Sequence, residues 1–591
     1  MPDFHSVDRK PLATKWQSHQ EAYDVVVIGS GYGGAISAAR IATASWPGGK
    51  PTVCLLERGK EWLPKQFPYK VDQALKTTYD PLFNPLGLYK FDGGVDIVSF
   101  QGSGLGGTSL LNANVAYNPE DEVFEKNWPA AIQDSLANGE LRKLFKRVIA
   151  TLRAQKHPQG QSLGKVKALK QGAAGHGDAP HFLNNIAVNF DGQNPWGVAQ
   201  RACINCGDCI TGCNVGAKNT LDTSYLKIAE LGGAHIFPQI DVRHIEVDKT
   251  NGGYRVHFVR HTDNDKTHKG TPGVLHARKA VVVCGGSIGS TEILLRSRKQ
   301  GLTLSAKIGR RWGGNADFLG IAYNSNLRTD VLGWGAFPTT DRAKRIQPQP
   351  NPTPSDMRVP GPTIVSTVRF NASGPFKKRV TVQDTSIPLV YVDLVRAGLA
   401  ASIGVDTDAG DESEEFARRW RDTFAIDPQL EKGALNYTMF YLVMGVDDQE
   451  GAIRLDPMGN AQIRWPKVGK QDVFDLENRL LKQHAKALGA TFEEHPLWRF
   501  SPWRTPVTVH PLGGCPMGDD VDHGVVDDLG RVFKANGDVY PGLYVTDGSI
   551  VPAPVGANPF LTISGLSERV AEGLIRDLGG SPRVVQDSTE I

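Results

Sequence analysis

The sequence predicts an α/β protein in which a Rossmann-type dinucleotide-binding domain, assembled from separate segments, adjoins an α+β substrate domain with an antiparallel sheet. Three observations predict this fold. The apolar strand Val25–Ile28 runs into a glycine-rich turn and an Ala-rich helix, and Ala280–Cys284 repeats the pattern late in the chain. Alternating strand patterns mark the region from Ile308 to Phe500. A strand–turn–helix that returns this late is typical of a discontinuous dinucleotide domain.

The first glycine turn indicates a phosphate-binding site. Gly29, Gly31 and Gly34 satisfy G-x-G-x-x-G, whose glycines provide a tight turn, close approach to a pyrophosphate and close helix–strand packing. The N–H groups that begin the following helix would hold phosphate. The next strand, Thr52–Leu56, ends at Glu57, about 20 residues on, where an acidic ribose ligand is expected. We therefore expect an adenine dinucleotide, and this segment leaves NAD and FAD open.

Length and composition narrow the class of protein. The 591 residues suggest about two to four domains, and 40% hydrophobic with 22% charged residues is ordinary for a soluble globular enzyme. A net charge of +3 without a basic stripe predicts no nucleic-acid partner. No apolar run approaches the roughly 18 residues of a membrane span, and the N-terminus lacks the apolar core of a secretory signal. We expect a cytoplasmic protein, with a periplasmic or exported mature form as the alternative.

Further elements follow from periodicity and composition. Gln101–Asn114 is a second glycine-rich stretch, expected as an ordered loop against a flat or anionic ligand. Glu120–Lys156 is helical in composition with a break at Trp128-Pro129, whereas Gln159–Pro195 is expected to form excursion loops. Other expected elements are an irregular segment (Trp62–Asp92), a helix (Thr223–Leu231), a hairpin (Ile236–Val247 and Tyr254–Arg260), a loop or lid (Arg345–Pro362), strands (Thr363–Phe370, Leu389–Leu394, Tyr437–Met444 and Leu543–Thr546), a solvated helix face (Asp411–Asp422) and a helix after Asn558-Pro559.

Four segments in this order resemble the glucose–methanol–choline (GMC) oxidoreductase family, and within it the cholesterol-oxidase-like branch. They are GSGYGG with Glu57, GSGLGGTSLLNAN, VTVHPLGGCPMG, and LYVTDGSIVPAPVGANPFLTISGLSER. The resemblance implies FAD rather than NAD. The domains we expect are an FAD-binding domain (20–120, 215–315 and 503–580), a helix with excursion loops (121–200), a cysteine-cluster insertion (201–214) and a substrate-binding domain (316–502).

The resemblance implies how FAD is bound. The first glycine turn meets the pyrophosphate, Glu57 the adenosine ribose, and the backbone of Val242 the adenine. Asp547 matches a ribityl contact, and the helix that begins at ANPF would aim its positive end at the pyrimidine edge of the ring. The implied FAD-binding residues are Gly29, Gly31, Tyr32, Gly33, Gly34, Glu57, Arg58, Gly102, Gly106, Gly107, Ser109, Asn112, Val242, Gly285, Asp547, Gly548, Asn558, Pro559 and Phe560.

Flavin-dependent alcohol oxidation needs an acceptor for the hydroxyl proton and a carbinol C–H held over the ring. His510 is our candidate base, because imidazole titrates near neutral pH, and Asn558 would hold the substrate oxygen. A histidine before Pro-Leu-Gly-Gly is by itself more often structural, and its pairing with ANPF favours catalysis. Steroid oxidases of this branch also use a carboxylate, which falls near VQDTSIP: an ungapped comparison places Gln383 there, and a shift of one residue places Asp384. Asp384 is therefore a third catalytic candidate.

Cys203, Cys206, Cys209 and Cys213 form C-x2-C-x2-C-x3-C, the spacing of ferredoxins, although Asn214 replaces the usual proline. This run predicts a [4Fe–4S] or [3Fe–4S] cluster. Zinc, two disulfides and an empty cysteine-rich loop are the alternatives.

The function we expect is oxidation of a bulky hydrophobic alcohol, sterol-like or aromatic, by hydride transfer to flavin N5. An external acceptor (a protein, a quinone or O₂) would take the electrons. An iron–sulfur cluster would favour a dehydrogenase. The alternatives are an O₂-reducing oxidase with a structural cysteine loop, a non-oxidative flavin lyase or photodecarboxylase, and an electron-carrier subunit.

Overall fold

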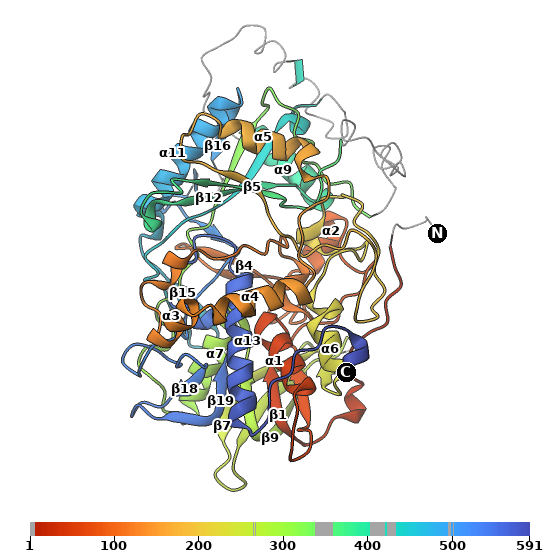
Figure 1. Ribbon diagram of the computed structural model, residues 1–591, viewed down its shortest axis with the longest axis vertical. Helices are drawn as coiled ribbons and strands as arrows, with labels where there is room; N and C mark the ends of the chain where they lie inside the picture. The colour runs from red at the N-terminus through yellow and green to blue at the C-terminus, as the bar shows by residue number, and fades with distance from the viewer. Residues whose placement is uncertain are drawn as a thin grey trace.

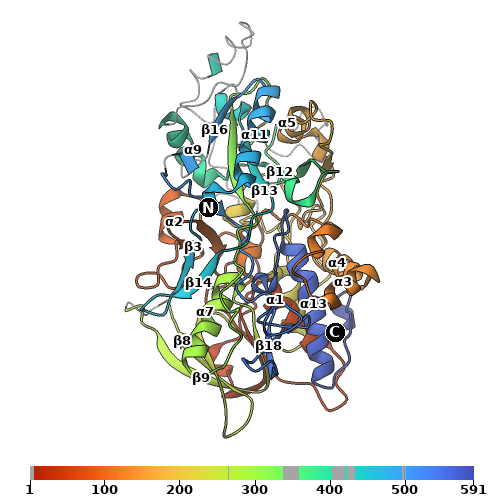
Figure 2. The same cartoon turned by 90° about the vertical axis from the view of Figure 1, so that its left-hand side faces the viewer.

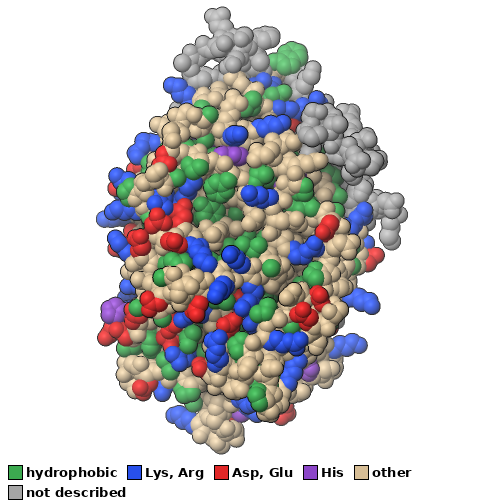
Figure 3. Space-filling view, in the orientation of Figure 1, with side chains coloured by type: hydrophobic (Ala, Val, Ile, Leu, Met, Phe, Trp, Pro, Cys, Tyr) green, Lys and Arg blue, Asp and Glu red, His purple; other side chains and the backbone are tan. Residues whose placement is uncertain are grey.

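The computed structural model describes residues 6–263, 265, 267–336, 358–401, 420–421, 433–494, 498–499 and 501–591. Most of Arg345–Pro362 and of Asp411–Asp422, expected as a loop or lid and as a solvated helix face, lies outside these residues. The chain forms two halves stacked along the long axis, and both ends of the sequence contribute to the lower one (Figure 1). On the face in Figure 3, acidic and basic side chains are interspersed.

The lower half is organised around an eight-stranded sheet whose central strands run parallel. β1 (Ala22–Ile28) lies between β2 and β9, and its last four residues are completely or almost completely buried. The parallel strands follow the order β19-β9-β1-β2-β6, and β18 and the β7–β8 hairpin add to them antiparallel. Their bounds are β2 (Val53–Leu56), β6 (His235–Phe237), β7 (Ile240–Val247), β8 (Tyr254–Arg260), β9 (Thr271–Val283), β18 (Arg531–Phe533) and β19 (Val539–Val545).

Helix α1 (Tyr32–Thr43) packs against this sheet and against α6 and α13, in the helical layer at the front of Figure 1. Close packing depends on the glycine turn. A Cβ on Gly33 would lie 1.5 Å from the carbonyl oxygen of Thr546, and one on Gly34 would lie 1.8 Å from that of Gly29. Gly29 itself has φ +94°, which favours glycine. The other main helices of this half are α3 (Ala130–Ala137), α4 (Glu140–Thr151), α6 (Tyr225–Leu231), α7 (Gly286–Lys299) and α13 (Phe560–Asp577).

The upper half contains a six-stranded antiparallel sheet in the order β16-β10-β13-β12-β11-β5, packed against α5 (Gly164–Gly172) and α11 (Asp472–Ala487) (Figure 2). Its strands are β5 (His181–Leu183), β10 (Phe318–Tyr323), β11 (Ser366–Phe370), β12 (Val380–Thr385), β13 (Met439–Met444) and β16 (Thr491–Glu494). Smaller elements are α2 (Val71–Lys76), β3 (Tyr89–Gly93), β4 (Val98–Gly102), β14 (Ala452–Leu455), β15 (Ala461–Arg464) and β17 (Val507–Thr508).

The predicted α/β class, with a Rossmann-type sheet and an antiparallel second sheet, is confirmed. Three local predictions are wrong. Leu389–Leu394 begins a helix, α9 (Leu389–Ala401), whose first N–H donates to Asp208 at 2.9 Å. Gln159–Pro195 contains α5 and β5, which are part of the upper half, and Trp62–Asp92 contains α2 and most of β3. Among the described helices, none has both the length and the hydropathy of a membrane span.

Candidate active site

Two adjoining cavities lie at the glycine turns, and one of them is also lined by residues of the upper half. The glycine cavity, about 130 Å³, is lined by the first glycine turn, the end of β2 and the starts of β7 and α7. The histidine cavity, about 310 Å³, is lined by Tyr32, Asn112, His510 and the Asn558–Phe560 segment. Gly31, Gln101, Thr108, Cys284 and Gly286 line both cavities.

The glycine cavity is shaped to admit an anion. A Cβ added to Gly31 would meet nothing within 4 Å, so this residue faces open space at the start of α1. No side chain caps the N-terminus of α1, which leaves its first N–H groups and the positive end of the helix dipole for a bound group. A Cβ on Gly107 would lie 2.9 Å from the Gly31 Cα, so the two glycine loops contact each other.

Glu57 directly follows β2, lines this cavity and is 6% exposed. Its carboxylate accepts from the N–H of Ser30 at 3.0 Å, from the Ser30 hydroxyl at 2.5 Å and from the N–H of Gly59 at 2.8 Å. The same wall contains Asp241, Glu292 and Arg296, which the sequence patterns did not single out.

The structure gathers most of the predicted FAD-binding residues around the two cavities. The glycine cavity is lined by Gly29, Gly31, Glu57, Arg58, Gly102, Gly107, Val242 and Gly285. The histidine cavity is lined by Gly31, Tyr32, Gly33, Asn112, Asp547, Gly548, Asn558, Pro559 and Phe560. The remaining three, Gly34, Gly106 and Ser109, line neither cavity. Gly106 donates its N–H to the Ser30 hydroxyl at 2.9 Å, and the Ser109 hydroxyl donates to the Gly106 carbonyl at 2.6 Å, so these residues fix the loop that forms the wall.

Asp547 joins the end of β19 to the start of α7. Its carboxylate accepts from the N–H of Gly286 at 2.9 Å, from the Ser290 hydroxyl at 2.5 Å and from the N–H of Ser549 at 2.8 Å. Burial raises the pKa of this carboxyl, and these hydrogen bonds oppose the rise. Asp547 thereby connects the C-terminal ends of the parallel strands β19 and β9 at Gly286, which lines both cavities.

His510 is held by a carboxylate that the sequence patterns did not reveal. Its Nδ1 lies 2.8 Å from Oδ1 of Asp317, which is 2% exposed. The other oxygen of Asp317 accepts from the Thr508 hydroxyl at 3.0 Å and from the N–H of Val509 at 2.7 Å. Because an ionised carboxylate only accepts, Nδ1 of His510 carries a proton, and in the neutral ring Nε2 is then an acceptor.

Asn558 is oriented by Gln383 on β12. The Gln383 amide donates to the Asn558 side-chain oxygen at 2.6 Å, and both residues are buried. This contact leaves the Asn558 NH₂ group as a donor toward the cavity that the residue lines. Asn315 fixes the preceding loop, because its side chain accepts from the N–H groups of Val555 and Gly556 and donates to the Ala557 carbonyl.

Asp384, proposed above as a catalytic carboxylate, lies away from the cavity. Successive side chains of β12 point to opposite faces, so Gln383 faces Asn558 whereas Asp384 faces α5. The Asp384 carboxylate lies 3.1 Å from the buried ammonium of Lys165 and accepts from Ser366. It does not line the histidine cavity, and we therefore correct that assignment.

The rest of the histidine cavity is mainly apolar. Leu319 and Leu442 from the upper sheet face Val115, Ile364 and Val509 there. Tyr32 stacks on Phe560 with ring centroids 5.0 Å apart, and Asn112 donates to its hydroxyl at 2.6 Å. Residues from both ends of the chain therefore enclose a pocket whose polar groups are concentrated near His510 and Asn558.

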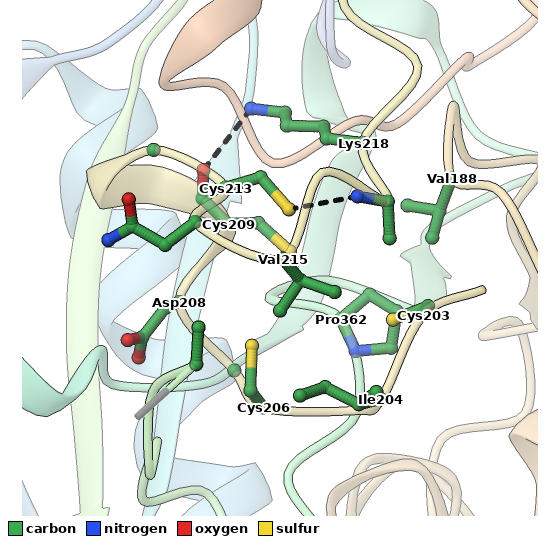
Figure 4. A pocket seen from close by; sticks show the side chains of 15 residues that line it. Val188, Cys203, Ile204, Cys206, Asp208, Cys209, Cys213, Val215, Lys218 and Pro362 are labelled. Carbon is green, nitrogen blue, oxygen red and sulfur yellow. Dashed lines mark hydrogen bonds between the residues drawn. The ribbon is translucent and has the colours of Figure 1, made fainter. Parts of the chain in front are cut away.

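The four clustered cysteines line a small enclosed cavity of about 20 Å³, and Figure 4 shows their sulfur atoms turned toward its interior. All seven cysteines, each within the described residues, are free. The N–H of Ala217 donates to the Cys213 sulfur at 3.3 Å, and that of Asn205 to the Cys203 sulfur at 3.4 Å. Burial raises the pKa of the Cys203, Cys206 and Cys213 thiols.

Lys218 connects the cysteine loop to the histidine cavity. Its ammonium donates to the Asn112 carbonyl at 2.7 Å and to the Cys209 carbonyl at 3.2 Å. Burial lowers the pKa of Lys218 to about 8, opposed by charge at Cys209 and Cys213. Ile210, beside Cys209, lines the histidine cavity directly.

Comparisons with known proteins show the family and the fold of this chain. The chain is 26% identical to a cholesterol oxidase of Mycobacterium tuberculosis, covering 93% of this chain and 90% of that protein. It is 24% identical to a long-chain-alcohol oxidase of Arabidopsis thaliana, covering 95% of this chain and 68% of that protein. A formate oxidase structure from Aspergillus oryzae matches the fold with a TM-score of 0.58 at 13% identity, over 94% of this chain and 99% of that one. Matches to the GMC oxidoreductase family extend over residues 23–312 and 475–567, and the chain belongs to that family.

Proposed function

We propose that this protein uses FAD to oxidise the CH–OH group of a bulky hydrophobic alcohol and passes the electrons to an external acceptor. The observation that carries the proposal is the pairing, in one largely apolar cavity, of His510 held by Asp317 and Asn558 held by Gln383. In this proposal His510 and Asn558 supply a base and an oxyanion donor in the cavity that adjoins the glycine cavity.

The residues present fit FAD. The open space at Gly31 and the uncapped start of α1 suit a pyrophosphate, and we assign Glu57 and Val242, which line the same cavity, to the ribose and the adenine. The helix α13 begins after Pro559 without a side-chain cap, so its positive end faces the histidine cavity. Bound FAD would supply the hydride acceptor.

The chain's own residues would handle the proton and the substrate oxygen. Nε2 of His510 accepts the hydroxyl proton, and Asp317 stabilises the imidazolium that results. The Asn558 amide donates to the oxygen as negative charge develops there. Apolar side chains around these groups exclude water, which strengthens both interactions. Replacing His510 by Ala should leave the flavin bound and slow its reduction about 10²–10⁴-fold.

A hydrophobic substrate is supported by the cavity walls and by relatives named for cholesterol and long-chain alcohols. The test is anaerobic bleaching of the bound flavin with sterols, aromatic alcohols, long-chain alcohols and sugars. We expect a hydrophobic alcohol to bleach the flavin fastest, and preference for sugars would contradict the substrate class. If no alcohol bleaches the flavin, a lyase or photodecarboxylase becomes the better assignment.

We further propose that Cys203, Cys206, Cys209 and Cys213 hold a [4Fe–4S] or [3Fe–4S] cluster. Four unbridged thiols, two on buried and two on partly buried cysteines, surround one enclosed space. Mononuclear zinc with bonds of about 2.3 Å would need sulfur atoms about 3.8 Å apart. Within the described residues, no three of these sulfurs lie within 4.8 Å of one another, a spacing more open than zinc requires. Such a cluster would supply a one-electron carrier.

Iron and sulfide analysis tests the cluster. Near-stoichiometric iron and sulfide, with visible absorbance that survives flavin extraction, would support it, and Cys206→Ser should abolish that absorbance. Stoichiometric zinc, or no metal, would refute it.

The relatives named as oxidases favour a second candidate, an O₂-reducing oxidase with a structural cysteine loop. Rates of oxygen consumption and of dye reduction, measured side by side with one alcohol, distinguish the two.

A further inference from the structure

Two histidines and a glutamate lie together on the β7–β8 hairpin, outside both cavities. His244 and His257 face each other in register across the two strands. Their rings are stacked, with centroids 4.3 Å apart and an angle of 12° between the planes. Glu246 follows His244 by two residues, so its side chain lies on the same face of the hairpin.

The three side chains converge on one point. Nε2 of His244 lies 3.5 Å from one carboxylate oxygen of Glu246, and Nε2 of His257 lies 3.2 Å from the other. One ligand atom from each residue can be chosen so that all three lie within 4.8 Å of one another. Nε2 of His257 is buried and makes no geometrically acceptable hydrogen bond within the described residues.

We propose that His244, Glu246 and His257 bind a divalent transition-metal ion, with zinc as the first candidate and water completing its coordination. Two imidazoles and a carboxylate are a ligand set that zinc accepts. Tetrahedral zinc with bonds of about 2.0–2.1 Å places ligand atoms about 3.3 Å apart. The separations to Glu246 are already close to this value, and small rotations of the two rings bring their nitrogens together.

An arginine already pairs with the carboxylate of this trio. Arg255 pairs with Glu246 at 2.5 Å, but its side chain is 51% exposed and can move into water when a cation takes its place.

The ion would clamp the middle of a hairpin whose first strand begins at the glycine cavity. Asp241 and Val242, at the start of β7, line that cavity. Joining His244 on β7 to His257 on β8 would restrict separation of the two strands, so the role we assign to the metal is structural.

The test measures zinc binding to the flavin-loaded protein by equilibrium dialysis with elemental analysis. We compare the wild type with His257→Ala, Glu246→Ala and the matched control His276→Ala. His276 lies on β9 of the same sheet with a similarly exposed side chain and is outside the trio. We expect the wild type and His276→Ala to bind one more equivalent than the other two variants, or to bind it at least tenfold more tightly.

Two further measurements keep the result attributable to this site. Cobalt can replace zinc as a spectroscopic probe. The cobalt equivalent that the wild type binds and His257→Ala does not bind should show no thiolate charge-transfer absorbance. This result would show that the ion is not bound by the cysteine loop. Zinc should also slow amide exchange in 240–260 of the wild type. Equal zinc stoichiometry and affinity in all four proteins, or unchanged exchange in the hairpin, would overturn the proposal.

Discussion

Replacing Asp317 by Asn tests whether His510 acts as a base whose ring is held in one tautomer. Oδ2 of Asp317 accepts from the N–H of Val509 at 2.7 Å, and this donor requires an oxygen, whereas the Thr508 hydroxyl at 3.0 Å can donate instead to the Gly314 carbonyl. An asparagine would therefore place its oxygen there and turn its NH₂ group toward Nδ1 of His510. Nδ1 must then accept, which leaves the ring proton on Nε2, the nitrogen that should take the substrate proton.

The expected loss follows from this change of tautomer. General-base catalysis by a positioned side chain contributes about 10²–10⁴ in rate. That factor equals about 2.7–5.4 kcal/mol of activation free energy. Asp317→Asn should approach the loss caused by His510→Ala but not exceed it, because both substitutions remove the same function. The double variant should be no slower than His510→Ala alone, since residues that act as a unit are not additive.

The assay is anaerobic stopped-flow reduction of the bound flavin by the best alcohol from the screen. Asp317 lines neither cavity, so flavin content should equal that of the wild type. Asp384→Asn is the matched control, because Asp384 is an equally buried carboxylate that faces α5 instead of the cavity. If Asp317→Asn reduces its flavin within twofold of the wild-type rate while His510→Ala is slow, the tautomer argument is wrong.

Three further predictions concern binding and stability. Gly31→Ala should weaken FAD binding about tenfold without lowering the unfolding free energy, because the added Cβ meets open space. Gly33→Ala should destabilise the fold, because its Cβ would lie 1.5 Å from a backbone oxygen. Flavin titration measures the first effect, and urea unfolding measures the second. Lys165→Met should cost about 3–5 kcal/mol in urea unfolding by leaving Asp384 unpaired, with flavin reduction per bound flavin unchanged. Burial raises the pKa of Asp447 to about 7 in the folded protein. As pH rises, the unfolded chain therefore loses this proton at a lower pH than the folded protein does. Stability should therefore fall as pH rises from about 4 to 7, and Asp447→Asn should flatten that slope in pH-dependent unfolding.

Local motifs predicted the parts of the site that a short segment encodes. The glycine turn could be identified because strand, turn and helix follow one another within 20 residues or so, and each glycine has its own steric reason. His510 and Asn558 were identifiable from the segments around them. The antiparallel second sheet was also predicted from the strand patterns that include β11 and β13, although both strands are buried throughout instead of alternating. These features depend on neighbours in sequence.

The partners of those residues could not be predicted from local pattern. Asp317 lies 193 positions before His510, and Gln383 lies 175 positions before Asn558. Asp317 follows Gly313 and Gly314 by a few residues and belongs to no periodic pattern that would indicate a functional role. The face of β12 decides between Gln383 and Asp384, and only the register of that strand shows it. The helix at Leu389 was mistaken for a strand because its apolar residues do not distinguish the two, and its start is fixed by Asp208, far away in the chain.

The cysteine loop packs against the wall of the histidine cavity, and this contact affects how cysteine variants are interpreted. Lys218 donates to carbonyls on both sides, so its ammonium bridges the Asn112 wall of the cavity and the backbone of Cys209. A cysteine substitution that disturbs the loop therefore also shifts the wall against which the flavin and the alcohol would lie. Loss of turnover in such a variant does not by itself show that electrons leave through the cysteines. The decisive variant is one that loses iron while flavin reduction keeps its wild-type rate: dye reduction must then fall if the cluster carries electrons, and must persist if the loop is structural.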